Sequence, residues 1–410
     1  MTDVDRSTTS ENTATQPGAR SPAKQSLPWT KLIALTFAAF ATVTMEMLPS
    51  GLLPQIGRGL GVEPAVAGAL VTAWALTVAL TSMPLVRATM KVRRTLLIPA
   101  TLGVVAVSSL VTAFAPTFEV ALLGRVAAAA GHGVFWAVIV AYVSGIVAPE
   151  QIGRALAIVL SGPTIAGFVG LPLGAALVEV AGWRAIFGGA SLVLALTAGL
   201  LVPLLADEPD GTDTSGTAAG ARWDRSVILS VGTAFAAALV LVAHFVLFTY
   251  VALLITEVAD WDAGAVAVLL TVFGAASAAG VALSGWLSDR WPRATLPASA
   301  FAALAAFSML CIAPAVPAVF VGAIVIWGGF IGLFPPAMQV RVLRLASPQF
   351  RPAAGGVVVT VLSLGVAGGA ALGGLIVGSE VAASGVEGLA PVALLVGAFG
   401  AFGLLLASRA

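Results

Sequence analysis

The chain has 410 residues, of which 59% are hydrophobic and only 10% are charged, and its mean hydropathy is +1.03. Soluble globular domains carry about a quarter charged residues, so this composition excludes a soluble protein and indicates one embedded in a lipid bilayer. The net charge of +1 provides no broad basic or acidic surface, which argues against nucleic acid as a partner.

Residues 1–28 are rich in Ser, Thr, Pro and Gly, with scattered charges. Such a segment cannot bury enough apolar surface to fold, so we predict a disordered cytoplasmic tail. The apolar run that follows has full spanning length, unlike the short apolar core of a cleavable signal peptide. We therefore expect the first helix to remain in the mature protein.

Apolar runs of about 20 residues, the length that crosses a bilayer as a helix, recur along the rest of the chain. They predict twelve spans in two six-helix halves, residues 29–206 and 226–410. The first six spans are expected at 30–51, 65–86, 95–115, 118–140, 152–178 and 183–205. The second six are expected at 226–251, 263–287, 294–313, 317–340, 353–378 and 388–408. Between the halves, the polar stretch 207–225 indicates a flexible cytoplasmic linker.

The distribution of Lys and Arg among the loops predicts the orientation. With both termini in the cytoplasm, all 20 basic residues except Arg58, Arg125 and Arg184 fall on the cytoplasmic side. Arg58 and Arg184 fall outside, and Arg125 lies within a helix. The positive-inside rule predicts this asymmetry for twelve spans, whereas an odd number of spans would scramble it. The predicted fold class is therefore an all-α membrane protein whose N and C termini are both cytoplasmic.

The two halves repeat each other in sequence. The segment 133–137 (GVFWA), in the fourth predicted span, recurs at 332–337 (GLFPPA) in the tenth. The basic loop 84–94 is matched by 285–293 (GWLSDRWPR) after the eighth span. Parallel halves of this kind place a substrate site at their interface, near the middle of the membrane.

The best-matched motif in the chain is the loop 285–293, which contains Asp289, Arg290 and Arg293. It is similar to the G-x-L-x-D-R-x-x-R loop of the major facilitator superfamily. Residues 30–408 resemble that superfamily, and within it the bacterial twelve-helix drug:proton antiporter group of multidrug, chloramphenicol and sugar exporters. The first-half loop departs from the motif, because Arg87 stands near where the family has Asp.

Three further segments extend this resemblance. Residues 46–56 (EMLPSGLLPQI) are similar to the opening of the arabinose and chloramphenicol exporter branch. Arg125 with 131–136 is similar to the family's arginine motif in the fourth helix. The fifth span resembles the antiporter motif of exporters through Gly162, Pro163, Gly167, Gly170, Pro172 and Gly174. The resemblance implies export across the bacterial cytoplasmic membrane, driven by the proton gradient and without a bound cofactor.

Ionisable side chains deep inside predicted spans are few: Glu46, Arg125, His132 and His244. A charge at a helix centre costs at least about 2.5 kcal/mol on insertion scales, so each of them is a functional hypothesis. The helix rise places Glu46 and Arg125 at similar depth, where they can form a pair whose opening is coupled to protonation of the carboxylate. The alternative is a static ion pair that locks two helices together.

His132 follows Arg125 by seven residues, so it projects from the same helix face and can relay a proton. The alternative is a neutral histidine bonded to a backbone carbonyl, and His244 has the same two interpretations. Trp136 lies four residues after His132 on the same face, so it can line an aromatic substrate cavity. The alternative is an aromatic residue that packs against other helices or lies at the membrane interface. Neither histidine has a Cys or acidic residue at metal-ligand spacing, so no metal site is predicted.

Pro163 and Pro172 lie in one predicted span and can bend it, while its glycines allow a neighbouring helix to approach closely. A bent, tightly packed helix can seal one side of the protein and yield when the halves rock. The alternative is ordinary packing of small residues.

These patterns predict a proton-coupled secondary transporter that exports a small drug-like or antibiotic compound by alternating access. Its expected partners are a small-molecule substrate, protons and the lipid bilayer, and it is expected to act as a monomer. One alternative is export of a sugar or another polar metabolite. Another is a non-transporting membrane sensor, against which Glu46 and Arg125 argue. The chain has no phosphate-binding loop or catalytic triad spacing, so we predict neither an ATP-driven pump nor an enzyme.

Overall fold

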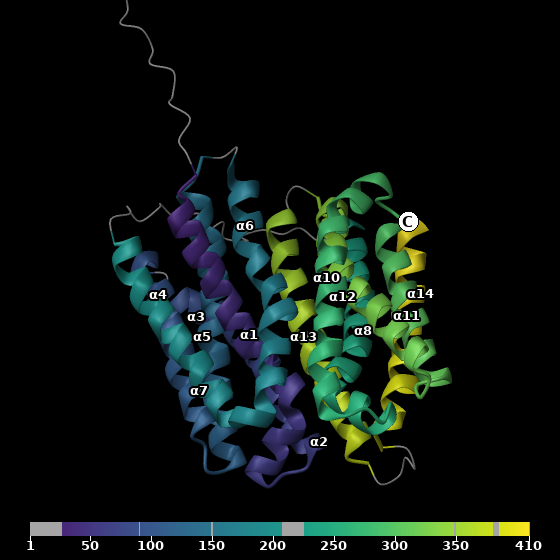
Figure 1. The fold of residues 1–410 in the computed structure, drawn as a ribbon. Helices are drawn as coiled ribbons and strands as arrows, with labels where there is room; N and C mark the ends of the chain where they lie inside the picture. Colours follow the sequence, from purple (N-terminus) through teal and green to yellow (C-terminus); the bar gives the residue numbers. More distant parts are fainter. Residues whose placement is uncertain are drawn as a thin grey trace, which may run out of the picture.

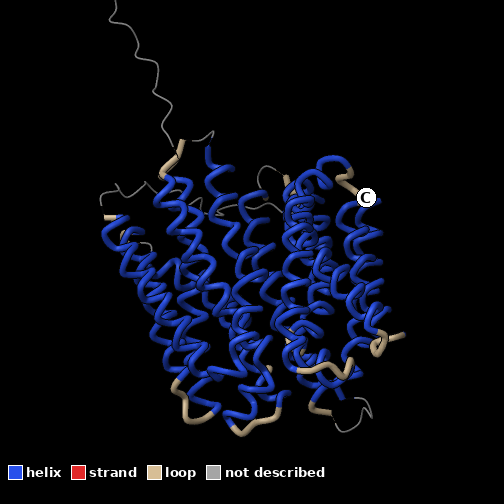
Figure 2. Tube along the Cα trace, in the orientation of Figure 1, coloured by secondary structure: helices blue, strands red, loops and turns tan. Residues whose placement is uncertain are grey.

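The computed structural model describes residues 27–89, 91–148, 151–206, 225–347, 350–379 and 385–409. Throughout these ranges the regular structure is helical and no strand occurs (Figure 2). The predicted tail up to residue 26 and the predicted linker up to residue 224 lie outside the described residues.

The helices of each half follow one another in chain order. The first half contains α1 (Trp29–Leu60), α2 (Pro64–Ala67), α3 (Ala69–Thr89), α4 (Arg94–Ala113), α5 (Phe118–Gly145), α6 (Ile152–Ile165), the π-helix η2 (Ala166–Gly170) and α7 (Leu171–Leu205). The second half contains α8 (Arg225–Phe248), α9 (Val251–Leu253), the π-helix η3 (Leu254–Val258), α10 (Ala263–Arg290), α11 (Thr295–Ile312), α12 (Pro317–Leu345), α13 (Arg351–Val377), the 3-10 helix η4 (Gly385–Gly388) and α14 (Leu389–Arg409).

Eleven helical stretches of the described chain are long and apolar enough to cross a membrane. One of them, Ile152–Leu205, has 54 residues. A helix of that length would measure about 80 Å, whereas the apolar core of a bilayer is about 30 Å thick. The stretch turns back at Gly182, whose φ of 76° and ψ of 153° are accessible almost only to glycine. It therefore provides the fifth and sixth spans, and the predicted all-α fold of twelve spans is confirmed.

The first helix is longer than predicted, because it continues past residue 51 to Leu60. Pro49 and Pro54 lie inside this helix. The helix instead ends at Gly61, which adopts a left-handed conformation (φ 68°) and donates its N–H to the carbonyl of Gly57. Prolines are tolerated inside membrane helices when neighbouring groups bind the carbonyls that they leave free.

Figure 1 shows two helical bundles side by side, the first half in purple to teal and the second in green to yellow. We call the end of the protein that carries Trp29 and Arg409 the terminal end, and the end that carries Gly61 and Gly182 the distal end. Each bundle has its own buried apolar cluster. The cluster of the second half also includes four residues of the first half, which packs the bundles together: Leu53, Ala67, Leu171 and Ala175.

The contacts between the halves join α3 and α2 with α13, α1 with α9, and α10 with α6, α7 and η2. At the last of these contacts, a Cβ atom on Gly274 would lie 2.6 Å from the carbonyl oxygen of Gly167. The backbones of α10 and η2 can therefore meet only because residue 274 is glycine.

Candidate functional site

Arg125 is completely buried in α5 and is bound to the backbone of α1. Its Nη1 donates to the carbonyl oxygen of Met45 at 2.8 Å, and its Nη2 donates to that of Glu46 at 3.1 Å. Pro49 explains why a carbonyl is available there, since it has no N–H to donate to the carbonyl of Met45 four residues earlier. The indole ring of Trp74, from α3, covers the guanidinium with 4.0 Å between Cζ and the ring centre.

The Glu46 carboxylate meets His132 instead of Arg125. Glu46 Oε2 lies 3.4 Å from His132 Nε2, and the other ring nitrogen, Nδ1, lies 2.9 Å from the hydroxyl oxygen of Thr42. His132 and Thr42 are buried, whereas 30% of the Glu46 side chain is exposed. Glu46 is therefore the least enclosed member of this chain of contacts.

These contacts differ in detail from the sequence-based expectation. The structure brings Glu46, Arg125 and His132 together, but no ion pair joins the side chains of Glu46 and Arg125 within the described chain. His132 bonds a hydroxyl group and not a backbone carbonyl. Thr42 was not among the expected site residues, although it lies four residues before Glu46 and so shares its helix face.

Two indole rings flank His132. Its ring centre lies 5.1 Å from that of Trp74 and 6.3 Å from that of Trp136, both in edge-on arrangements. Trp136 is partly exposed, whereas Trp74 is buried. Trp136 is therefore the less enclosed of the two rings. We call Thr42, Glu46, Trp74, Arg125, His132 and Trp136 the first-half polar cluster.

His244 lies in the second half, in a separate and largely aromatic environment. The indole Nε1 of Trp327 donates to His244 Nδ1 at 2.8 Å, and Phe248 and Phe273 stack on the imidazole with ring centres 5.2 and 6.4 Å away. An indole N–H can only donate, so Nδ1 carries no proton and the imidazole is neutral. This geometry favours the structural interpretation of His244.

The glycines of the fifth span pack mainly against α1. Added Cβ atoms on Gly162, Gly170 and Gly174 would collide with α1, at Phe40, Thr44 and Leu48 respectively. Gly167 instead directs its carbonyl to Gly274 of the second half. The π-helix η2 lies between Pro163 and Pro172, and such π-helical turns are frequent at functional sites. The span thus contacts both α1 and the opposite half.

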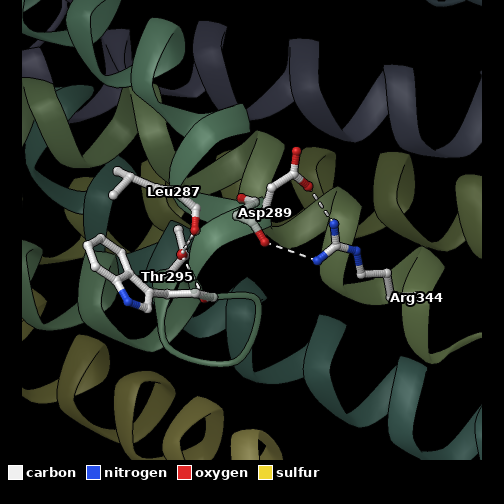
Figure 3. Close-up of polar contacts among 6 residues, drawn as sticks. Leu287, Asp289, Thr295 and Arg344 are labelled. Atoms are coloured by element: carbon white, nitrogen blue, oxygen red, sulfur yellow. Dashed lines mark hydrogen bonds and ion pairs between the residues drawn. The ribbon is translucent and has the colours of Figure 1, made fainter.

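Figure 3 shows the loop motif at the terminal end of α10. Arg344 of α12 contacts Asp289 Oδ1 through Nη2 at 2.7 Å, and it donates through Nη1 to the carbonyl of Ser288 at 3.0 Å. Arg290 lies over the ring of Trp291, and Arg293 is exposed in the turn after α10. Arg344 was not among the expected motif residues, because its approach to Asp289 depends on how α10 and α12 pack.

The family model described as Major Facilitator Superfamily matches residues 35–370 and 233–409. Two proteins named chloramphenicol efflux pump, from Mycobacterium tuberculosis strains CDC 1551 and H37Rv, are each 35% identical to the chain over 365 residues, which cover 85% of the chain and 87% of each relative.

Similar solved structures include an inward-facing, unoccupied bacterial homologue of the human lysosomal transporter Spinster. Its TM-score is 0.74 at 18% identity, covering 94% of this chain and 98% of that one. A D-xylose-proton symporter has a TM-score of 0.73 at 13% identity, covering 93% and 97%. At these identities, the likeness concerns the fold.

Proposed function

The chain belongs to the major facilitator superfamily, and on that premise we propose that it exports a small drug-like or antibiotic compound in exchange for protons. It is a multi-pass transporter of the bacterial cell membrane and not an enzyme. The observation that carries the proposal of proton exchange is the contact of Glu46 with His132, beside a buried Arg125. We further propose that the protein acts as a monomer and needs no cofactor.

The first-half polar cluster can accommodate Glu46 with or without a proton. When Glu46 is ionised, it accepts the Nε2 hydrogen of His132 while the Thr42 hydroxyl donates to Nδ1. When Glu46 is protonated, it can donate to Nε2, and the Nδ1 hydrogen of the other tautomer can be accepted by the Thr42 oxygen. Both states give each ring nitrogen of His132 a hydrogen-bond partner, but only the ionised one balances the charge of Arg125. Protonation therefore changes the energy of this half and can shift the conformational equilibrium.

The names of the two relatives favour an antibiotic as substrate, since both are called chloramphenicol efflux pumps. The partly exposed ring of Trp136 next to His132 suits an aromatic, amphipathic molecule better than a sugar. Export of a sugar remains the alternative substrate class, and a non-transporting sensor the alternative function.

A direct test uses everted membrane vesicles that contain the protein and have an acidic interior. Adding chloramphenicol is expected to dissipate part of the pH gradient, as reported by a pH-sensitive dye, and arabinose is expected to have no effect. Vesicles without the protein provide the control. A response to arabinose alone would indicate that the substrate is a sugar and not an antibiotic. A lack of response to any compound that binds the purified protein would favour a non-transporting sensor.

We propose that the terminal end faces the cytoplasm, which the loop charges support, and that the distal end closes during transport. The Tyr250 phenol lies between the halves there. Its hydroxyl donates to the carbonyl of Ala370 in α13 at 3.3 Å, and its ring lies against Gly68, just before α3. A side chain at position 68 would occupy the space of the phenol.

Gly68→Val is therefore expected to hold the distal end open. Spin labels at Arg58→Cys and Glu257→Cys, two residues that line one pocket from opposite halves, report this opening in a background where Cys311 is replaced by Ser. In electron-electron distance measurements, the main population of distances between the two labels is expected to become longer. Gly232→Val, on an open face of α8, should leave the distances unchanged. If Gly68→Val also leaves them unchanged, Tyr250 does not control closure.

A further inference from the structure

One buried indole contacts all three ionisable residues of the first-half polar cluster. Trp74 of α3 is only 1% exposed, and its ring covers the Arg125 guanidinium. The same ring meets the imidazole of His132 edge-on, with 5.1 Å between the ring centres. The indole N–H interacts with the carboxylate of Glu46. An indole can only donate a hydrogen bond, so Trp74 can respond to the charge of this cluster but cannot carry its proton.

The N–H of Trp74 is not satisfied in this conformation. Nε1 is buried and has no hydrogen-bond partner among the described residues, so its approach to Glu46 falls short of hydrogen-bond geometry. A buried donor without a partner costs free energy. Glu46 can remove that cost, because an ionised carboxylate accepts several hydrogen bonds and because this side chain, 30% exposed, has room to turn. A complete hydrogen bond between the two side chains requires a different conformation.

The helix that carries Trp74 also reaches the contact that we expect to close the distal end. α3 packs along α13 of the second half. Just before α3, Gly68 lies against the ring of Tyr250, and its carbonyl accepts two hydrogen bonds from the first turn of α3. Gly68 and Trp74 are six residues apart, about 9 Å along a helix. A movement of Trp74 toward Glu46 therefore also moves the backbone against which Tyr250 rests.

We propose that Trp74 is a positioning residue that couples the charge of Glu46 to the distal end: its N–H completes a hydrogen bond to the ionised carboxylate when the distal end opens. This coupling rests on the proposed role of Glu46 in proton exchange. A hydrogen bond to a charged acceptor is roughly twice as strong as one between neutral groups, so protonation of Glu46 weakens the bond and favours the closed distal end. A proton that enters from outside would then close the side from which it came, as alternating access requires.

The pH response of the distal end has two possible sources. Within the described chain, the charged or titratable side chains that face Glu46 are Arg125 and His132, both from α5. At the distal end itself, Glu63 and Glu179 line pockets between the halves. These two carboxylates titrate without any contact with the polar cluster. A variant that has no titratable group at position 46 is therefore needed to separate the two sources.

The distal spin-label pair Arg58→Cys/Glu257→Cys can measure this coupling in the full-length protein in lipid nanodiscs, again without Cys311. Raising the pH from mildly acidic to mildly alkaline should ionise Glu46 and open the distal end. In the otherwise wild-type protein, the ratio of long to short distances is expected to rise about tenfold, the effect of one hydrogen bond to a charged group. Glu46→Gln should abolish this rise.

Two tryptophan variants show whether the indole N–H transmits the charge. Trp74→Phe keeps an aromatic ring over Arg125 but has no N–H, so the rise should fall below about twofold. Trp327→Phe is the matched control, because Trp327 is also buried and donates its N–H to His244 in the second half. It should retain the rise of the wild type. A merely structural role of Trp74 would lower stability without removing the dependence on pH.

A shape-matched analogue covers the case in which Trp74→Phe does not fold. Tryptophan with sulfur in place of the ring N–H, inserted at position 74 by stop-codon suppression, keeps the shape of the indole and should also lose the rise. If Glu46→Gln loses the rise but either Trp74 variant retains it, the coupling through Trp74 is overturned and the proposed function stands. A rise that persists in Glu46→Gln would overturn the proposed role of Glu46 and the coupling with it. Absence of any rise in the wild type would also overturn the coupling.

Discussion

Replacing Glu46 by Gln is expected to abolish proton-coupled transport and to leave the protein folded. Gln has the shape of Glu and can still accept a hydrogen bond from His132 Nε2, but it cannot take up a proton. The cluster would then hold one protonation state permanently, and the shift between the two states of Glu46 would be lost. In everted vesicles, the collapse of the pH gradient on addition of chloramphenicol should fall to the level of vesicles without the protein.

Glu119→Gln is the matched control for this variant. Glu119 is an exposed residue in the first turn of α5, the helix that carries Arg125 and His132, so its replacement should leave the gradient collapse intact. Binding of chloramphenicol to purified Glu46→Gln protein, measured by thermal shift, should persist. Full coupling in Glu46→Gln would show that the contact of Glu46 with His132 is structural and that protons are carried elsewhere.

Replacing Arg125 by Met is expected to cause the largest loss of stability of any single substitution in the first-half polar cluster. The variant loses the hydrogen bonds to the carbonyls of Met45 and Glu46, and it leaves the Glu46 carboxylate without a compensating charge. Each buried carbonyl left without its hydrogen-bond partner costs about 1–3 kcal/mol. Thermal unfolding in detergent should therefore begin at a clearly lower temperature, and transport should be lost.

Arg184→Met shows what the loss of backbone hydrogen bonds costs by itself. Arg184 donates to the carbonyl of Ala115 at 3.0 Å, but it is partly exposed and has no buried carboxylate to balance. Its replacement should lower the free energy of unfolding by only about 1 kcal/mol.

The double variant Arg125→Met/Glu46→Gln removes both charges of the cluster. It should recover much of the stability lost in Arg125→Met and remain inactive in transport, because the proton acceptor is missing. A double variant as unstable as Arg125→Met would mean that the carbonyl contacts and packing of Arg125, and not its charge, stabilise the half. Recovery of transport would contradict the coupling role of Glu46.

The twelve spans could be predicted because each depends on a local property of the sequence. A helix that crosses the bilayer satisfies its own backbone hydrogen bonds and needs only a sufficiently long apolar run. The division between the fifth and sixth spans was also foreseeable from the break near Gly182. The end of α1 was predicted wrongly, since the span was expected to stop at residue 51 and the helix continues through Pro54 to Leu60.

The partners of the ionisable residues could be predicted only in part. Sequence spacing placed Arg125 and His132 on one face of α5 and put Glu46 at a similar depth. The binding of Arg125 to the carbonyl of Met45 had one signal in the sequence, Pro49 four residues later. The pairing of Asp289 with Arg344 had no local signal, because 55 positions separate the two residues along the chain.

The sequence by itself thus determined that this protein crosses the membrane twelve times and that Glu46, Arg125 and His132 lie within its spans. Only the tertiary structure decided that Glu46 contacts His132 and that Arg125 binds the backbone of α1. The physical reason is one of range. Membrane insertion depends on the apolar character of about 20 consecutive residues, whereas a hydrogen bond depends on the distance and angle between groups on different helices.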